Sequence, residues 1–263
     1  MPPEERRVAV KIAYLGKDFS GSQIQPGLRT VVGQIISDLE AISGGREREW
    51  FNIKTASRTD AGVNALENVV VFNTAIMDDC RLLRGLNAVS DGVFYRSIAT
   101  VGDDFNPRFA SYRTYRYLLP SKGIDIPKAK ECSELFLGEH DFIRFCKLYD
   151  KATVMSIASI EIEEEGDILA MTFHSRYFLW NMIRKIVAAV ASVGRGDSSA
   201  EDVQRALDGE DLSFGLARPD ALTLTEVSYD DVVFEVPCDN ILSKRVREEL
   251  FLGDIRRDFF KSL

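Results

Sequence analysis

The order of hydrophobic and polar positions in the first hundred residues predicts a compact set of strands and helices. Apolar residues alternate along the segment from Val8 to Tyr14, as they do in a strand. From Val31 to Ile42 they recur every three or four residues, as in a helix, and Thr30 is available to cap its start. Further strands are predicted at residues 51–56, 69–72 and 93–99, and a second helix at residues 82–89.

This order, β-α-β-β-α-β, is that of the split βαβ or ferredoxin-like fold. Right-handed crossovers predict that both helices lie on one face of a four-stranded antiparallel sheet. Residues 105–108, with the sequence Phe-Asn-Pro-Arg, break the pattern and mark the predicted boundary. The chain is therefore divided into an N-terminal half, residues 1–106, and a C-terminal half, residues 107–263.

The C-terminal half is predicted to elaborate the same pattern, which gives an α+β fold. Strands are expected at residues 113–119, 158–162, 168–174 and 222–227, and residues 138–142 are expected to be a loop that leads into a short helix. Longer helices are expected from Phe178 to Val193, from about Ser198, and near the C-terminus. The halves share no evident sequence repeat, so any symmetry between them would be topological.

The connection between the second and third predicted strands is unusually polar. It runs from Thr55 to Ala65 and places Asp60 before an alanine and Gly62. A short side chain at a glycine-containing bend can be held at a fixed point, and Arg58 nearby would keep the carboxylate ionised. These features indicate a nucleophile or a charge stabiliser, although taken alone they fit an ordinary Asx-type turn better.

The helix predicted from Phe178 to Val193 is apolar on nearly all sides after its first turn, so it should be buried between layers. It contains Arg184, and a buried guanidinium needs a partner such as a carboxylate. Alternatively the arginine extends to solvent from near the helix start. If Arg184 faces a cleft between the halves, Asp60 is the acidic residue expected to meet it.

Composition places the chain among globular proteins and restricts how it could bind nucleic acid. Of its 263 residues, 45% are hydrophobic and 28% are charged, which is not the composition of a disordered chain. The net charge is −8, whereas nucleic-acid binding usually leaves a basic footprint. Any RNA site must therefore be a local basic patch on an acidic body.

The cysteines and histidines predict neither a metal site nor a disulfide framework. Their spacing contains no C-x-x-C, and His140 and His174 are isolated. The charged N-terminus lacks the apolar run of a signal peptide, so a cytoplasmic protein is expected. In such a protein the cysteines should be reduced core thiols; they are Cys80, Cys132, Cys146 and Cys238.

Six segments, taken in order, resemble the TruA family of tRNA pseudouridine synthases. Residues 57–63 resemble the catalytic R-T-D-A-G-V segment of that family. One short motif would be weak evidence by itself, so the other five segments and their order matter. The other five are similar to its first strand and G-W-Q turn, its A-R-x-Y-x-Y strand, its G-x-H-D-F element, its F-L-x-x-M-V-R helix and its G-L-x-L strand. They lie at residues 14–23, 109–117, 138–142, 178–184 and 221–224.

The resemblance implies two ferredoxin-like (RRM-like) halves that form one continuous, mostly antiparallel sheet, with helices on one face and an active-site cleft between the halves. It implies a homodimer that binds tRNA and modifies the anticodon stem-loop at tRNA positions 38 to 40. Neither a metal nor an organic cofactor is expected, and no membrane or DNA partner. Asp60 would be the catalytic aspartate, Tyr115 the aromatic residue on the target base, and Arg184 the ionic partner of Asp60.

A further set of residues is predicted to contact the substrate. Besides Tyr115 these are Gln23, Arg58, Arg113, Phe178 and Leu222. Taken alone, an aromatic residue such as Tyr115 is more commonly a core or cross-strand residue. Tyr117, two residues on and on the same face of the strand, is the candidate for that role.

Two positions depart from the family pattern. Ser22 stands where the family usually has tryptophan, and Asn64 stands where it usually has histidine. Since neither position is the predicted nucleophile, altered substrate contacts are expected before lost activity.

Two other functions are compatible with parts of the chain. A non-catalytic RRM-like RNA-binding protein would need base-stacking aromatic residues, but residues 68–72 lack the aromatic-rich pattern of such sheets. A glycoside hydrolase would need paired carboxylates, and the segment around Asp60 offers one aspartate beside arginines.

Overall fold

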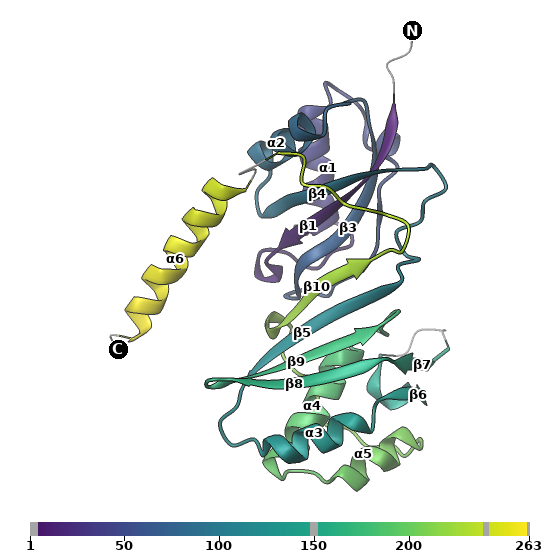
Figure 1. Ribbon diagram of the computed structural model, residues 1–263, viewed down its shortest axis with the longest axis vertical. Helices are drawn as coiled ribbons and strands as arrows, with labels where there is room; N and C mark the ends of the chain where they lie inside the picture. Colours follow the sequence, from purple (N-terminus) through teal and green to yellow (C-terminus); the bar gives the residue numbers. More distant parts are fainter. Residues whose placement is uncertain (1–4, 148–151, 239–241, 262–263) are drawn as a thin grey trace.

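The computed structural model describes residues 5–147, 152–238 and 242–261; the first four residues of the charged N-terminal stretch lie outside this part. Its main feature is one long, mixed and mostly antiparallel sheet with the strand order β4-β1-β3-β10-β5-β9-β8, and β2 pairs with β3 off this path (Figure 1). None of the described helices is long and apolar enough to span a bilayer.

The N-terminal half has the predicted order of elements. Strand β1 (Arg6–Tyr14) pairs antiparallel with both β3 (Asn64–Thr74) and β4 (Val93–Val101). The helices are α1 (Val31–Ile42) and α2 (Asp79–Val89), with short 3-10 turns η1 (Gly16–Asp18) and η2 (Arg48–Phe51). The cap predicted for α1 is confirmed, since the Thr30 hydroxyl accepts a hydrogen bond from the Gly33 N–H at 3.2 Å.

The strand predicted at residues 51–56 is shorter in the structure. Strand β2 contains only Lys54–Thr55, which pair with β3. Phe51 belongs instead to η2 and is fully buried, and Asn52 adopts a left-handed conformation with φ 45°. A strand cannot continue through that conformation, so its apolar residues reach the core from a turn.

In the C-terminal half the main-sheet strands are β5 (Tyr112–Pro120), β8 (Ser159–Glu165), β9 (Ile168–Ser175) and β10 (Leu222–Ser228). Their order, β10-β5-β9-β8, matches β4-β1-β3-β2 of the first half when strands are numbered within each half. The helices are α3 (Ile126–Glu134), α4 (Met182–Arg195), α5 (Ala200–Leu207) and α6 (Ser243–Lys261), of which α6 stands apart from the rest in Figure 1.

The predicted loop at residues 138–142 is a strand in the structure. Gly138–Asp141 form β6, which pairs with β7 (Val154–Ile157) in a separate two-stranded sheet. The 3-10 turn η3 (Ile143–Phe145) follows in place of a short helix. This insertion is the main elaboration of the second half.

The helix predicted from Phe178 to Val193 begins four residues later. Asn181 precedes α4 in a left-handed conformation with φ 62°, which separates Phe178 and Trp180 from the helix. The helix ends after Arg195 at Gly196, whose φ of 78° suits a residue without a side chain. The predicted burial is confirmed for most of α4, which packs against α3.

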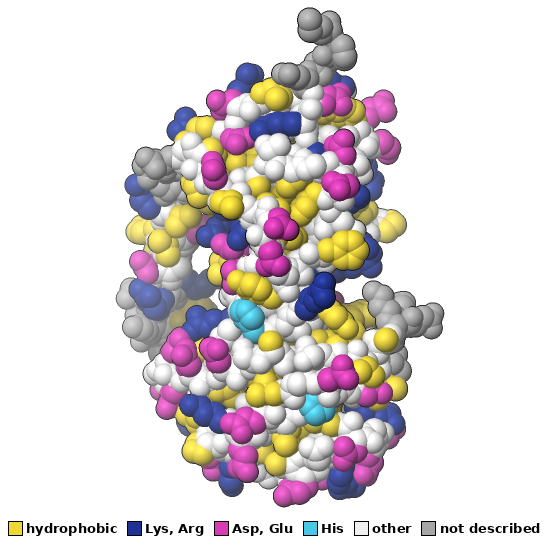
Figure 2. Space-filling model, turned by 45° about the vertical axis from the view of Figure 1, so that its right-hand side comes forward, with side chains coloured by type: hydrophobic (Ala, Val, Ile, Leu, Met, Phe, Trp, Pro, Cys, Tyr) yellow, Lys and Arg dark blue, Asp and Glu magenta, His cyan; other side chains and the backbone are white. Residues whose placement is uncertain are grey.

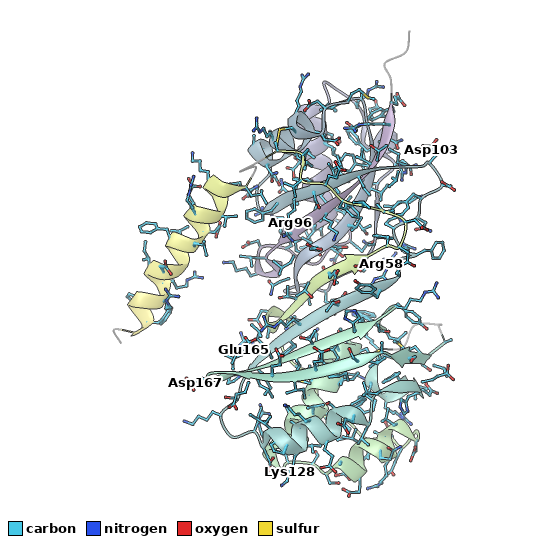
Figure 3. All side chains as sticks on the ribbon, viewed as in Figure 1. Arg58, Arg96, Asp103, Lys128, Glu165 and Asp167 are labelled. Carbon is cyan, nitrogen blue, oxygen red and sulfur yellow. A yellow bond between two sulfur atoms is a disulfide. The ribbon has the colours of Figure 1, made fainter. Side chains whose placement is uncertain are left out.

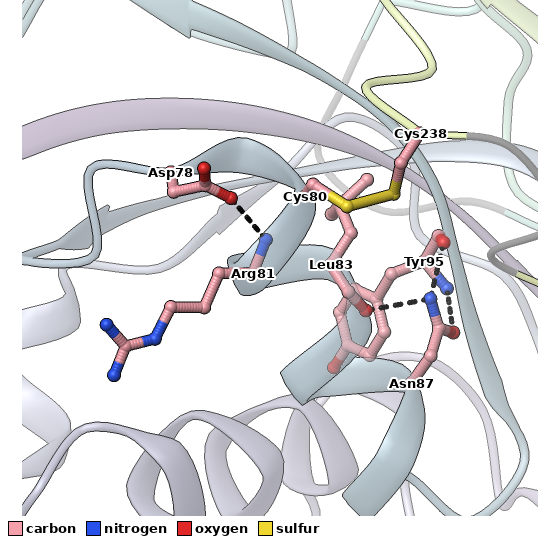
Figure 4. The surroundings of a disulfide bond; sticks show 7 residues. All are labelled: Asp78, Cys80, Arg81, Leu83, Asn87, Tyr95 and Cys238. Atoms are coloured by element: carbon pink, nitrogen blue, oxygen red, sulfur yellow. Dashed lines mark hydrogen bonds between the residues drawn. A yellow bond between two sulfur atoms is a disulfide. The ribbon is translucent and has the colours of Figure 1, made fainter.

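The prediction of four reduced cysteines is wrong for two of them. Cys80 of α2 and Cys238 form a disulfide with their Cα atoms 5.6 Å apart (Figure 4). The two positions are 158 residues apart, and they meet because the chain returns to the N-terminal half after β10, where Ile98 and Glu235 exchange backbone hydrogen bonds of 2.9 Å. The remaining cysteines are buried and free, as predicted; they are Cys132 and Cys146.

Candidate active site

The Asp60 loop, defined as residues 56–63, leads from β2 into β3 beside the junction of the two halves. The Val63 N–H donates to the Asp60 carbonyl at 3.1 Å, and Gly62 between them has φ 85°. This turn requires a glycine, because other side chains strain a positive φ. Arg58 of this loop is labelled in Figure 3, where it lies beside β5 and β10.

The N-terminal half holds the Asp60 loop through Thr59 and through Ser57, whose N–H donates to Asn68 Oδ1 at 3.2 Å and whose carbonyl accepts from Asn68 Nδ2 at 3.0 Å. The Thr59 N–H donates to the Ser22 hydroxyl at 2.9 Å, and the Ser22 N–H donates to the Thr59 carbonyl at 3.0 Å. The hydroxyls of Thr59 and Tyr14 are 2.8 Å apart. Gly16 packs so closely that a Cβ there would lie 2.3 Å from the Gly62 backbone, so only glycine is compatible with this contact.

The C-terminal half holds the start of the loop through Arg113 of β5. Its Nε donates to the Ser57 hydroxyl at 2.9 Å, and its Nη2 donates to the carbonyls of Ala56 at 3.1 Å and Arg108 at 3.0 Å. Its Nη1 donates to the Arg176 carbonyl. Burial lowers the pKa of Arg113 from its usual value. Since protein acceptors occupy all three nitrogens, this arginine fixes the loop, and its predicted contact with substrate stays a prediction.

Asp60 and Arg184 come from different halves and lie within pairing distance, as the sequence predicted. Arg184 Nη1 is 3.5 Å from Asp60 Oδ2, and the side chains are 13% and 33% exposed respectively. Arg184 Nε also donates to the Ala217 carbonyl at 2.7 Å, and Nη1 to Asn181 Oδ1 at 3.2 Å. Arg58 is exposed. The arrangement fixes a carboxylate that is partly open to solvent beside a cation.

Tyr115 lies in β5 and is largely buried. Its ring meets Phe178 edge to face, with ring centroids 5.4 Å apart. Burial raises the pKa of Tyr115 well above the usual value, and nearby Tyr14 acts in the same direction. The phenol is therefore neutral at physiological pH. Tyr117 is 3% exposed and pairs with the buried Leu222 of β10, so the core role predicted for Tyr117 is confirmed.

The remaining predicted contacts lie around this junction. Gln23 Nε2 is 3.5 Å from the Thr55 hydroxyl, and Thr55 is the residue that precedes the loop.

Charged side chains of both signs are mixed over the face of the molecule shown in Figure 2. Among the described residues, no group of three or more histidine, cysteine or acidic side chains could hold a metal ion.

Both departures from the family pattern make structural contacts. Ser22 is 1% exposed and binds the loop as described. Asn64 Nδ2 donates to the carbonyls of Asp220 at 2.9 Å and Leu222 at 3.4 Å, and its Oδ1 accepts from the Gly16 N–H at 2.9 Å.

Sequence reasoning missed these contacts and the role of Arg113 in holding the loop. For Arg113 a signal was available, because residues 113, 115 and 117 face the same side of a strand and Tyr117 was expected to be in the core.

Comparison with known proteins finds relatives along most of the chain. A family model described as tRNA pseudouridine synthase matches residues 133–230, a range that includes Arg184 but not Asp60. The tRNA pseudouridine synthase A of Pyrococcus abyssi is 42% identical over 92% of this chain and 91% of its own length. The protein of that name from Methanosarcina barkeri is 36% identical over 86% of each chain.

Solved structures give weaker matches. A Cbf5-Nop10-Gar1 complex contains a chain that is 13% identical, covers 70% of this chain and 45% of that one, and superimposes with a TM-score of 0.33, which is too low to carry an argument. The sequence relatives match nearly from end to end. The chain therefore belongs to the TruA family of tRNA pseudouridine synthases, which are isomerases.

Proposed function

We propose that this enzyme converts uridine to pseudouridine in the anticodon stem-loop of tRNA, with Asp60 as the catalytic residue. The observation that carries the proposal is the pairing of Asp60 with Arg184 across the junction of the halves. The carboxylate is fixed by this contact and is one-third exposed, so it is both positioned and reachable.

The reaction suits a single ionised carboxylate. The bond between uracil N1 and ribose C1′ breaks, the base turns, a C5–C1′ bond forms, the C5 proton leaves, and N1 takes up a proton, so that the product is an isomer of the substrate. The carboxylate could add to C6 of the base, attack C1′, or remove a proton from C2′, and each route requires an ionised aspartate at a fixed position. Arg184 Nη1 lies 3.5 Å from Asp60 Oδ2 and places a positive charge beside this carboxylate.

Tyr115 would receive the target base. Unstacking a base costs a few kcal/mol, and stacking on an aromatic ring replaces part of the lost contact. Phe178 holds the Tyr115 ring from the side. Because the Tyr115 hydroxyl is neutral, it can take the C5 proton only by giving up its own proton at the same time; water is the other candidate base.

The remaining features of the proposal concern assembly and substrate contact. We infer two ferredoxin-like halves with the helices on one face, a tRNA-binding cleft between the halves, and a homodimer that works in the cytoplasm. Arg58, Gln23, Phe178 and Leu222 would contact the RNA. The exposure of Arg58 next to the Asp60 loop supports its contact with phosphate or base.

Tritium release from tRNA labelled at uridine C5 tests the role of Asp60. Asp60→Asn keeps the size of the side chain and removes its charge, and it should lower the rate at least 1,000-fold, while the exposed Asp103→Asn should leave the rate unchanged. Release that persists in Asp60→Asn would refute the assignment. A wild-type protein that binds tRNA and releases no tritium would instead indicate an RRM-like binding protein.

A further inference from the structure

Arg184 is attached twice to one residue of the C-terminal half. Its Nε donates to the Ala217 carbonyl at 2.7 Å, and the Ala217 N–H donates to the Arg184 backbone carbonyl at 3.1 Å. The position of the guanidinium therefore depends on where Ala217 lies. Ala217 opens a short segment, residues 217–222, that leads into β10 and is called the 217–222 segment here.

The other end of the 217–222 segment is attached to the Asp60 loop and the start of β3. Asn64 Nδ2 donates to the carbonyls of Asp220 and Leu222. Pro219 packs against Gly62, where a Cβ would lie 3.0 Å from the proline Cγ. The same segment thus touches Arg184 at one end and the turn that carries Asp60 at the other.

Asn64 joins three parts of the chain. Its amide nitrogen donates to the C-terminal half, and its oxygen accepts from the Gly16 N–H of the N-terminal half at 2.9 Å. A side chain with one donor group and one acceptor is needed to make both contacts. Asn64 is also one of only two β3 residues that pair with β10, the other being Ala65.

The interior of the segment has little conformational freedom. Residues Pro219–Ala221 form the 3-10 turn η4, and the proline ring fixes one backbone angle. The Arg218 guanidinium also donates to the Asp220 carboxylate, with a distance of 2.7 Å from Nε. Because the segment is short and restrained, a displacement of one end also displaces the other end.

We propose that the 217–222 segment sets the distance between Arg184 and Asp60, with Asn64 as its attachment to the N-terminal half. Asn64 and Pro219 are then positioning residues for the reaction, although neither needs to touch the substrate. This inference rests on the proposed catalytic role of Asp60.

Asn64→Asp tests the proposal because it changes one function of the amide. The new carboxylate can still accept from the Gly16 N–H, but it cannot donate to the two carbonyls and places a charged oxygen against them. We expect kcat to fall at least tenfold while KM for tRNA stays within about threefold, because the ion pair shifts and the RNA-binding surface does not.

Asn73→Asp is the matched control. Asn73 lies at the other end of β3, where its Nδ2 donates to the Trp50 carbonyl at 3.1 Å inside the N-terminal half. The new carboxylate loses the Trp50 contact but keeps the one in which Asn73 Oδ1 accepts from Arg7 Nη1 at 2.6 Å, and the control should leave kcat unchanged. A wild-type kcat in Asn64→Asp, or an equal loss of kcat in both variants, would overturn the proposal.

A second variant acts on the segment itself. Pro219→Gly should also lower kcat, and the double variant with Asn64→Asp should lose less than the product of the two single losses, since both act through one element. Independent, multiplicative losses would contradict the proposal. Asp60→Asn is measured in parallel. If this variant keeps the wild-type rate, the catalytic assignment of Asp60 fails. If Asp60→Asn is inactive while Asn64→Asp is fully active, only the positioning role is refuted.

Discussion

The Asp60 loop is held differently by the two halves. Its own half uses a reciprocal pair of hydrogen bonds between Ser22 and Thr59, within a sheet region where β1 and β3 share eight residue pairs. The other half shares only two residue pairs between β3 and β10. It reaches the loop instead with long polar side chains, those of Arg113 and Arg184.

Because of this difference, the conformation of the loop and the placement of Asp60 against Arg184 depend on different contacts. The loop is shaped by contacts inside the N-terminal half and, at its start, by Arg113 of the other half. The placement of Asp60 against Arg184 depends on few side chains that cross the junction, so single substitutions there should affect the site more than substitutions on the other side of the loop.

Arg113→Lys should give the largest effect on stability. A lysine has one nitrogen in place of three and cannot donate to Ser57, Ala56 and Arg108 together, which leaves buried acceptors unpaired. We expect a loss of about 3 kcal/mol in the free energy of unfolding, measured with urea. Arg116→Lys on the same strand is the control, because its half-exposed pairing with Glu165 should contribute less than about 1 kcal/mol. Equal losses in both would show that Arg113 does not link the halves.

Tyr115→Phe should give an intermediate effect that depends on pH. Burial raises the pKa of Tyr115 in the folded protein above that of the unfolded chain, so the unfolded chain loses its proton first. This contribution to stability is complete below pH 10 and is lost as the pH rises further. Between pH 8 and pH 11, urea unfolding should show a loss smaller by about 1.4 kcal/mol in Tyr115→Phe than in the wild type.

The control for this experiment is Tyr112→Phe, on the same strand and half-exposed. As the pH rises from 8 to 11, Tyr112→Phe should lose as much free energy of unfolding as the wild type. An unchanged alkaline loss in Tyr115→Phe would mean that the phenol at the junction ionises as freely in the folded protein as in the unfolded chain.

Ser22→Ala should give the smallest effect, because it changes the attachment within one half. The Thr59 N–H loses its acceptor, but the backbone bond from Ser22 to the Thr59 carbonyl remains. We expect a loss of about 1 kcal/mol in unfolding and a kcat within twofold of the wild type. A tenfold fall in kcat would show that attachment within the N-terminal half also controls the site.

Much of the fold was predictable from the sequence because its signals are local. Apolar periodicity predicted the strands and helices of the first half, and the apolar helix around Arg184 left two possibilities, a buried arginine paired with a carboxylate or one that extends to solvent. The start of α4 was not predictable in this way, because the apolar pattern continues through Phe178 while the backbone turns at Asn181.

The contacts that complete the site depend on partners far along the chain. Asn64 donates to a carbonyl 156 residues away, and Cys80 bonds a cysteine 158 residues away. Neither partner is marked by a local pattern: one is a backbone carbonyl that every residue has, and the other is a cysteine without a motif. Only the folded arrangement of β10 and of the segments before and after it brings these partners together.

The bond between Cys80 and Cys238 closes a covalent ring of residues 80–238, which contains β5 to β10 and leaves α6 outside. If the molecule is stretched from its two ends, force passes along residues 1–80, crosses the disulfide and leaves through the last residues. Strand β3 and the Asp60 loop lie on that route, whereas Arg184 lies inside the ring and bears no tension through the backbone. Pulling would therefore draw Asp60 away from Arg184. The fully stretched chain would also be shorter than its sequence allows, because the residues inside the ring would not extend.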